Sequence, residues 1–207
     1  MTTTEAIREK LAAQPTGEAF TPALFAGLGS RASIDMALMR MVKAGAVERL
    51  GRGIYHVPKV GRFGIPSTPS VEQIVETVAA SEGATLEVHG AEAARRFGLS
   101  TQMPTRPVFN TSGANRRLRV GKLIVELRHV ASRKMILAGR PAGQALSALW
   151  YLGRNEVRPS TFAQLKSKLS QEEFQLLRKA QPSMPSWMSN ALTIYEREGA
   201  HAKLLRA

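Results

Sequence analysis

The sequence predicts a mixed α+β protein in which a module of helices and one hairpin precedes a second domain. Apolar residues recur at helical spacing through residues 4–44, which is typical of helices that cover a core. Two short β-prone segments then flank a glycine-containing turn at residues 47–57. Short apolar strands alternate with helices beyond residue 70, and residues 142–198 have helical patterns only. We therefore expect an N-terminal winged helix-turn-helix, a mixed α+β domain and a helical C-terminal tail.

The N-terminal module has the order helix, turn, helix, hairpin. Thr21 and Ser30 are good N-cap residues, and Gly45 is suited to end the helix that Ser30 begins. The helices are expected at about residues 4–14, 21–26 and 30–44. Because helix, turn, helix and hairpin follow one another in winged helix-turn-helix proteins, residues 1–60 are predicted to form a DNA-binding domain.

A segment rich in proline, glycine and serine, residues 59–69, is expected to link this module to a second domain at residues 70–207. Its strands are expected at residues 85–88, 108–111, 118–120 and 123–129. Its helices are expected at about residues 70–82, 90–97, 142–152, 161–169, 171–180 and 186–198. The second domain is therefore predicted to be α+β with a helical tail.

The chain is strongly basic, with a formal net charge of +13 among 207 residues. Residues 95–140 contain eleven basic side chains against one acidic side chain, that of Glu126. Such a balance predicts a polyanionic partner or an acidic protein. No apolar run approaches the roughly 20 residues of a spanning helix, and the N-terminus lacks a signal-peptide pattern. We therefore expect a cytoplasmic, nucleoid-associated protein without a membrane partner.

The hairpin tip and the second helix of the module supply the candidate DNA contacts. Arg52 lies between two glycines at the tip, where an arginine can enter a minor groove or contact phosphate, and Arg49 could support it. Arg31, Ser33 and Arg40 would face the major groove. The alternative is an ordinary solvated surface at each position.

Enzyme activity is not expected. The chain has no cysteine, which excludes disulfides, thiolate nucleophiles and cysteine-bound zinc. Its four histidines are scattered without the spacing of metal ligands, and no close carboxylate pair accompanies them. The sequence therefore predicts no catalytic residue, no metal and no cofactor.

Three segments of the chain form a recognisable combination. They are the wing segment Gly51-Arg52-Gly53-Ile54-Tyr55, residues 88–104 with their ending Leu-Ser-Thr-Gln-Met-Pro, and Arg128-His129 after an apolar strand. Together they resemble the AbiEi-type antitoxins of type IV toxin–antitoxin systems, which act in abortive infection. The resemblance covers about residues 5–153 and is greatest to the short, largely uncharacterised branch of that family.

This resemblance implies a transcriptional repressor whose winged helix binds repeats in the promoter of its own operon. It implies a C-terminal domain that counteracts a nucleotidyltransferase-like toxin encoded nearby, and it implies no catalytic residue. Only the wing and the helix before it carry over to a DNA-contact role, at Gly51, Arg52, Gly53, Arg31, Ser33 and Arg40.

A second basic patch is expected on the hairpin near residue 120, at Arg116, Arg117, Arg119 and Lys122. These side chains could contact DNA phosphates, an acidic toxin surface or RNA, or form a solvated sheet face. Two other functions stay open: a plain winged-helix regulator without a toxin partner, and an RNA-binding protein that uses the basic block of residues 95–140.

Overall fold

The computed structural model describes residues 2–15, 17–60 and 66–204, which form two compact units. The first unit contains residues 1–84 together with residues 117–125, and the second contains residues 85–116 together with residues 126–207. The fold is mixed α+β, as the sequence predicts. The first unit extends beyond the expected module at residues 1–60, because it also includes one further helix and the tip of a second hairpin.

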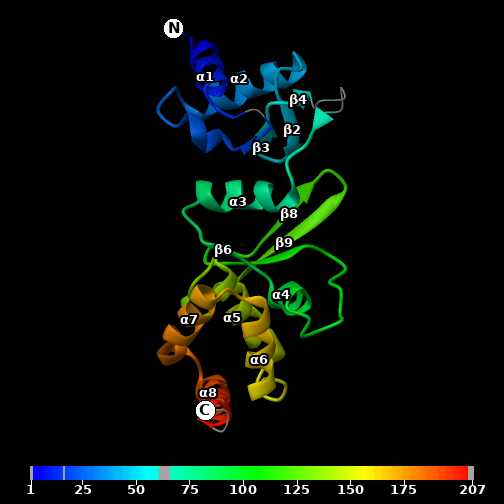
Figure 1. The fold of residues 1–207 in the computed structure, drawn as a ribbon. Coiled ribbons are helices and arrows are strands. Elements are labelled where there is room, and N and C mark those ends of the chain that lie inside the picture. Colours follow the sequence, from blue (N-terminus) through cyan, green and yellow to red (C-terminus); the bar gives the residue numbers. More distant parts are fainter. Residues whose placement is uncertain (1, 16, 61–65, 205–207) are drawn as a thin grey trace. The chain divides into compact units, whose positions relative to one another are not determined.

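Helices and a small antiparallel sheet make up the N-terminal part of the first unit (Figure 1). The helical segments are α1 (Thr3–Ala12), the 3₁₀ helix η1 (Pro22–Phe25) and α2 (Arg31–Lys43). The strands are β1 (Ala19–Phe20), β2 (Glu48–Gly51) and β3 (Ile54–His56), in the order β1-β3-β2. The predicted order of helix, turn, helix and hairpin is therefore confirmed.

Local signals account for the ends of these helices. The Ser30 side chain accepts a hydrogen bond from the Ser33 amide, as an N-cap residue should. Thr21 makes no such bond, and the helix predicted at residues 21–26 is a four-residue 3₁₀ helix that begins with Pro22. The core beneath the helices contains Ile7, Leu11, Phe20, Phe25, Ile34, Ala37, Leu38, Met41, Val47 and Tyr55.

Helix α3 (Val71–Ser81) also belongs to the first unit. Its Ser70 N-cap forms a capping box with Gln73. The Thr77 hydroxyl donates a 2.8 Å hydrogen bond to the Gln73 carbonyl oxygen, and its oxygen lies 3.5 Å from the carbonyl oxygen of Ala19 in β1. The segment expected to be a linker instead contains β4 (Lys59–Val60) and β5 (Pro66–Ser67), which pair antiparallel. Its residues 61–65 lie outside the described part of the chain.

The second unit combines part of a four-stranded sheet with a helical region. The sheet has the order β6-β7-β9-β8, in which β6 and β7 are antiparallel whereas β7 and β9 are parallel. The strands of this sheet are β6 (Leu86–Val88), β7 (Val108–Thr111), β8 (Arg116–Val120) and β9 (Leu123–His129), of which residues 117–125 are assigned to the first unit. The helices of the second unit are α4 (Gly90–Arg96), η2 (Ser132–Lys134), α5 (Pro141–Leu152), α6 (Pro159–Lys168), α7 (Gln171–Lys179), η3 (Gln181–Ser183) and α8 (Ser186–Leu204).

Helix α5 is the centre of the second unit. The Ser147 hydroxyl donates a 2.9 Å hydrogen bond to the Val88 carbonyl of β6 and accepts one from Asn110 of β7. On its other sides α5 shares a core with α4 and with helices α6 to α8, which includes the fully buried Phe162. None of the helices in the described ranges has a stretch long and apolar enough to span a membrane.

Candidate nucleic-acid interface

The turn between β2 and β3 forms an exposed tip with an arginine at its end. Gly53 has φ +72°, a conformation that favours glycine, and Arg52 before it is exposed. The Arg49 side chain is also exposed, and its Nε donates a 3.1 Å hydrogen bond to the Gly51 carbonyl oxygen. Arg49 and Arg52 are thus presented to solvent from the wing hairpin, β2 and β3.

A second hairpin tip lies directly against this wing hairpin, within the first unit. The Gly121 amide, in the turn between β8 and β9, donates a 3.2 Å hydrogen bond to the carbonyl oxygen of Leu50 in β2. A Cβ atom on Gly51 would lie 2.5 Å from the carbonyl oxygen of Arg119, so only glycine allows the two backbones this approach. The sequence shows both hairpins but cannot show that they touch.

This contact brings the two predicted basic groups together on one unit. Leu118 of β8 is buried, whereas Arg117 and Arg119 on either side of it are exposed, as alternation along a strand requires. Lys122 is exposed in the turn. We call the exposed cations of the two hairpins, Arg49, Arg52, Arg117, Arg119 and Lys122, the hairpin patch.

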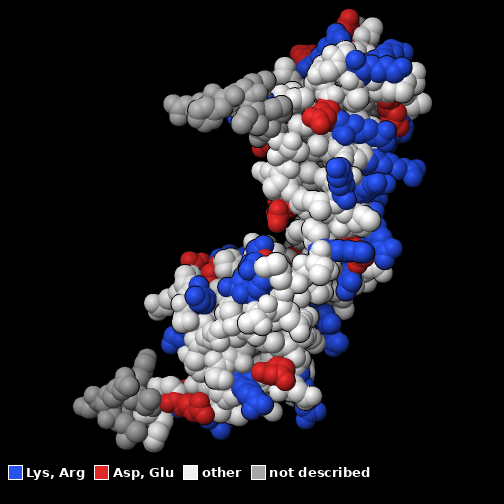
Figure 2. Space-filling model, turned by 90° about the vertical axis from the view of Figure 1, so that its right-hand side faces the viewer, with Lys and Arg blue, Asp and Glu red and all other residues white. Residues whose placement is uncertain are grey.

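Figure 2 shows many Lys and Arg side chains over the first unit, at the upper right of that view, and others over the second unit. Arg116 is exposed as well but is assigned to the second unit, one residue outside the hairpin tip. The hairpin patch therefore contains three of the four residues of the predicted second basic patch.

Of the three predicted contact residues on helix α2, two are exposed and one is half-buried. Arg31 is exposed and pairs with Asp35, with 2.9 Å between Nε and Oδ2. Arg40 is exposed one turn from the end of the helix. The half-buried Ser33 instead turns its hydroxyl to the Ser30 carbonyl oxygen, to which it donates a 2.8 Å hydrogen bond.

Sequence reasoning overlooked two residues on the outer face of α2. Met36 and Met39 are 46% and 44% exposed, although methionine is usually an interior residue. Their spacing could have identified them. At 3.6 residues per turn, Met36 and Met39 lie on the helix face opposite the buried Ile34 and Leu38.

The profile of a family described as "Family of unknown function (DUF6088)" matches residues 6–177. The chain belongs to this family. A comparison with curated proteins gives no match. The DUF6088 match spans every candidate contact residue from Arg31 to Lys122.

Three of the four histidines of this DUF6088 protein make contacts within the fold. His56 is fully buried with its Nε2 3.1 Å from Glu48 Oε2, and His129 Nδ1 lies 2.8 Å from the Gly113 carbonyl oxygen. His89 is the N-cap of α4, and burial lowers its pKa. Among the described residues, no three of His, Asp and Glu come together as metal ligands would.

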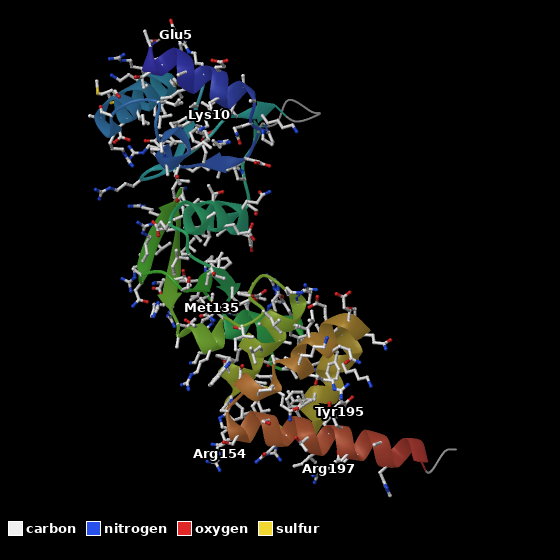
Figure 3. The ribbon with its side chains drawn as sticks, turned by 90° about the vertical axis from the view of Figure 1, so that its left-hand side faces the viewer. Glu5, Lys10, Met135, Arg154, Tyr195 and Arg197 are labelled. Carbon is white, nitrogen blue, oxygen red and sulfur yellow. The ribbon has the colours of Figure 1, made fainter. Side chains whose placement is uncertain are left out.

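A groove of about 610 Å³ in the second unit is lined by residues of α6, α7 and α8. Phe174 and Tyr195 form an edge-to-face ring contact there, and Figure 3 labels Tyr195 on α8. The carboxylate of Glu196 in this groove is already paired with Arg178. Apart from this ion pair, the described lining residues offer apolar surface, glutamine side chains and the cation of Lys166.

One ion pair holds the start of α5. Arg140 donates from Nε (3.0 Å) and Nη2 (2.7 Å) to Glu173 Oε1, while Glu173 Oε2 accepts from the Ala142 amide. The hydrogen bond from Arg140 lowers the pKa of Glu173. Hydrogen bonds from Arg95 and then Arg96 lower the pKa of Glu92 to about 2.

These lowered pKa values predict acid sensitivity of the second unit. A carboxylate with a pKa lower in the folded than in the unfolded state stabilises the fold above its unfolded pKa, and this stability is lost as pH falls through the folded pKa. We expect the melting temperature to fall between about pH 5 and pH 2. Near neutral pH, Glu173→Gln should have a lower melting temperature than the wild type. On acidification, its melting temperature should fall less than that of the wild type.

Glu156→Gln provides the matched control, because Glu156 is an exposed carboxylate of the second unit outside this ion pair. Burial raises the pKa of Glu87, so the contribution of this carboxyl to folding stability changes with pH in the opposite direction and is most favourable at low pH. If the melting temperature of Glu173→Gln falls with pH as much as that of the wild type, the ion pair is not the source of the acid sensitivity.

Proposed function

We propose that this protein is a DNA-binding transcriptional autorepressor that is also the antitoxin of a type IV toxin–antitoxin pair. The observation that carries the DNA-binding part is the contact between the two hairpins, which unites the cations of the hairpin patch on the unit that contains α2. Phosphate contacts require such clustered, exposed cations, and a duplex offers a groove to a helix such as α2. A cytoplasmic, nucleoid-associated location follows from this proposal.

In this proposal the helix and the wing have separate tasks. Arg40 and the outer face of α2 read base edges in the major groove, while Arg52 anchors the wing in a minor groove or on phosphate. Arg119 and Lys122 add phosphate contacts from the second hairpin. Ser33 has a smaller task, because its hydroxyl already bonds to the Ser30 carbonyl oxygen.

The antitoxin part rests on the resemblance to the AbiEi-type antitoxins. The second domain would counteract a nucleotidyltransferase-like toxin encoded next to this gene. A plain regulator without a toxin is the first alternative, and an RNA-binding protein that uses residues 95–140 is the second. The groove among α6, α7 and α8 is surface that a protein partner could use.

The test is a gel-shift titration with the duplex immediately upstream of the protein's own gene, a scrambled duplex of equal length and an RNA of the same sequence. We expect preference for the upstream duplex and roughly tenfold weaker binding by Arg52→Ala. Arg154→Ala, which removes an exposed arginine from the second unit, should bind as the wild type does.

Equal binding of both duplexes by all three proteins would overturn the repressor proposal, and preference for RNA would favour the RNA-binding alternative. The antitoxin part is tested by co-expression with the neighbouring toxin gene. Arg52→Ala should neutralise the toxin as well as the wild type does, because the change lies in the first unit. Absence of a nucleotidyltransferase gene beside this one would favour the plain regulator.

A further inference from the structure

The outer face of α2 carries an apolar strip. Ala32, Met36, Met39 and Lys43 are all exposed and follow one another at spacings of four, three and four residues, so they lie in one line along the helix. The opposite face, which includes Ile34, is buried in the core of the first unit. Met36 and Met39 are therefore not needed for the core.

Charged side chains border this strip on both sides. Arg40 lies on one flank, and the Arg31–Asp35 pair lies on the other. Lys43 ends the strip at the C-terminus of the helix. A helix face that is apolar along its centre and predominantly cationic at its borders matches a surface that is anionic at its edges and has apolar points inside.

The major groove of DNA is such a surface. Its walls are phosphates, and the C5-methyl group of thymine is the apolar group that its floor presents. A methionine side chain is long, unbranched and polarizable, so it can adapt to a methyl group at a range of positions. Ala32, at the N-terminal end of the strip, has a methyl group of its own that suits close approach to a base edge.

We propose that Met36 and Met39 contact thymine methyl groups in the major groove and so select A·T pairs at their positions in the operator. This inference rests on the proposed DNA-binding function and identifies which residues give it sequence preference. Arg40 and Lys43 hold the helix against the phosphates beside those bases. The sulfur-containing side chains contribute apolar contact, and no hydrogen bond to a base is required of them.

The experiment replaces every thymine of the upstream duplex by uracil, which lacks the C5-methyl group but keeps the same pairing edge. Wild-type protein should bind the thymine duplex about tenfold more tightly than the uracil duplex, since each lost methyl contact costs about three- to fourfold. For Met36→Ala/Met39→Ala the ratio should fall towards one. Both positions are exposed and alanine favours helix, so the variant should keep its fold.

Arg52→Ala is the matched control, since it should weaken binding to both duplexes and leave the thymine-to-uracil ratio unchanged. An equal ratio for the wild type and the double methionine variant overturns this inference, while the DNA-binding proposal stands. A wild-type protein that binds neither duplex overturns both. If the methionine changes instead alter the oligomeric state and leave the ratio unchanged, the strip is a contact between copies of the chain.

Discussion

Gly143→Ala should destabilise the second unit by about 3 kcal/mol or more and lower its melting temperature by about 6–12 °C. Gly143 lies in the first turn of α5 and is buried. A Cβ atom there would overlap the carbonyl oxygen of Leu137 and lie 2.6 Å from its carbonyl carbon. The obstacle is backbone, so no side-chain rotation can relieve it.

The backbone around Leu137 has little freedom to move away. Leu137 already has φ +63°, which is unfavourable for a residue with a side chain, and its carbonyl oxygen accepts a 3.1 Å hydrogen bond from the Arg140 amide. The Gly139 amide next to it donates to the buried Glu87 carboxylate. Displacing this turn would disturb the Glu87 contact and the start of α5 together.

Gly199→Ala is the control for Gly143→Ala. Gly199 lies in α8 of the same unit with no atom within 4 Å of the position of a new Cβ. Alanine there should be neutral or stabilise the helix by about 0.5–1 kcal/mol. Thermal unfolding followed by circular dichroism measures both variants, and equal melting temperatures for Gly143→Ala and the wild type would show that the turn before α5 is adaptable.

Elements with strong local signals were predictable from the sequence. Ser30 and Ser70 are followed by helices and cap them in the structure. The strand prediction at residues 123–129 is matched by β9, because an apolar run bounded by glycine and charged residues is a local feature. In these cases the sequence neighbours of a residue determine its conformation.

The arrangement of these elements depends on contacts between residues far apart in the sequence. The capping box at Ser70 predicts α3, but only the packing of α3 on β1, where Thr77 lies next to Ala19, assigns it to the first unit. The glycine at residue 51 suits a turn, whereas its closeness to Arg119 reflects packing between two hairpins. The helical period separates the buried Met41 from the exposed Met39, but it does not show which residues of other elements lie beside them.

The contact between the two hairpins also determines whether their basic residues can bind one duplex together. From the sequence, Arg52 and Arg119 belong to separate basic groups, each of which an ordinary solvated surface would explain. In the structure the Gly121–Leu50 hydrogen bond joins their hairpins within one unit. Cations fixed on adjacent hairpins can neutralise neighbouring phosphates of one duplex, which scattered surface cations cannot do.

Arg52→Glu/Arg119→Glu should therefore weaken binding to the upstream duplex by at least about a hundredfold at moderate salt. Each change removes a phosphate contact and places a negative charge beside the polyanion. The slope of log affinity against log salt concentration should become shallower by about two, because each lost contact releases about one counterion fewer. Equilibrium titration at several salt concentrations measures both quantities.

The matched control for this charge reversal is Arg154→Glu/Arg197→Glu, which changes the net charge equally on the second unit (Figure 3). Both control residues are exposed. If the hairpin patch binds the duplex, the control should lose far less affinity and keep its salt slope. Equal losses for the two pairs would mean that total charge alone drives binding. If Arg119→Glu alone leaves affinity and slope unchanged, the wing contacts DNA without the second hairpin, whose contact with β2 then serves only to hold the wing in place.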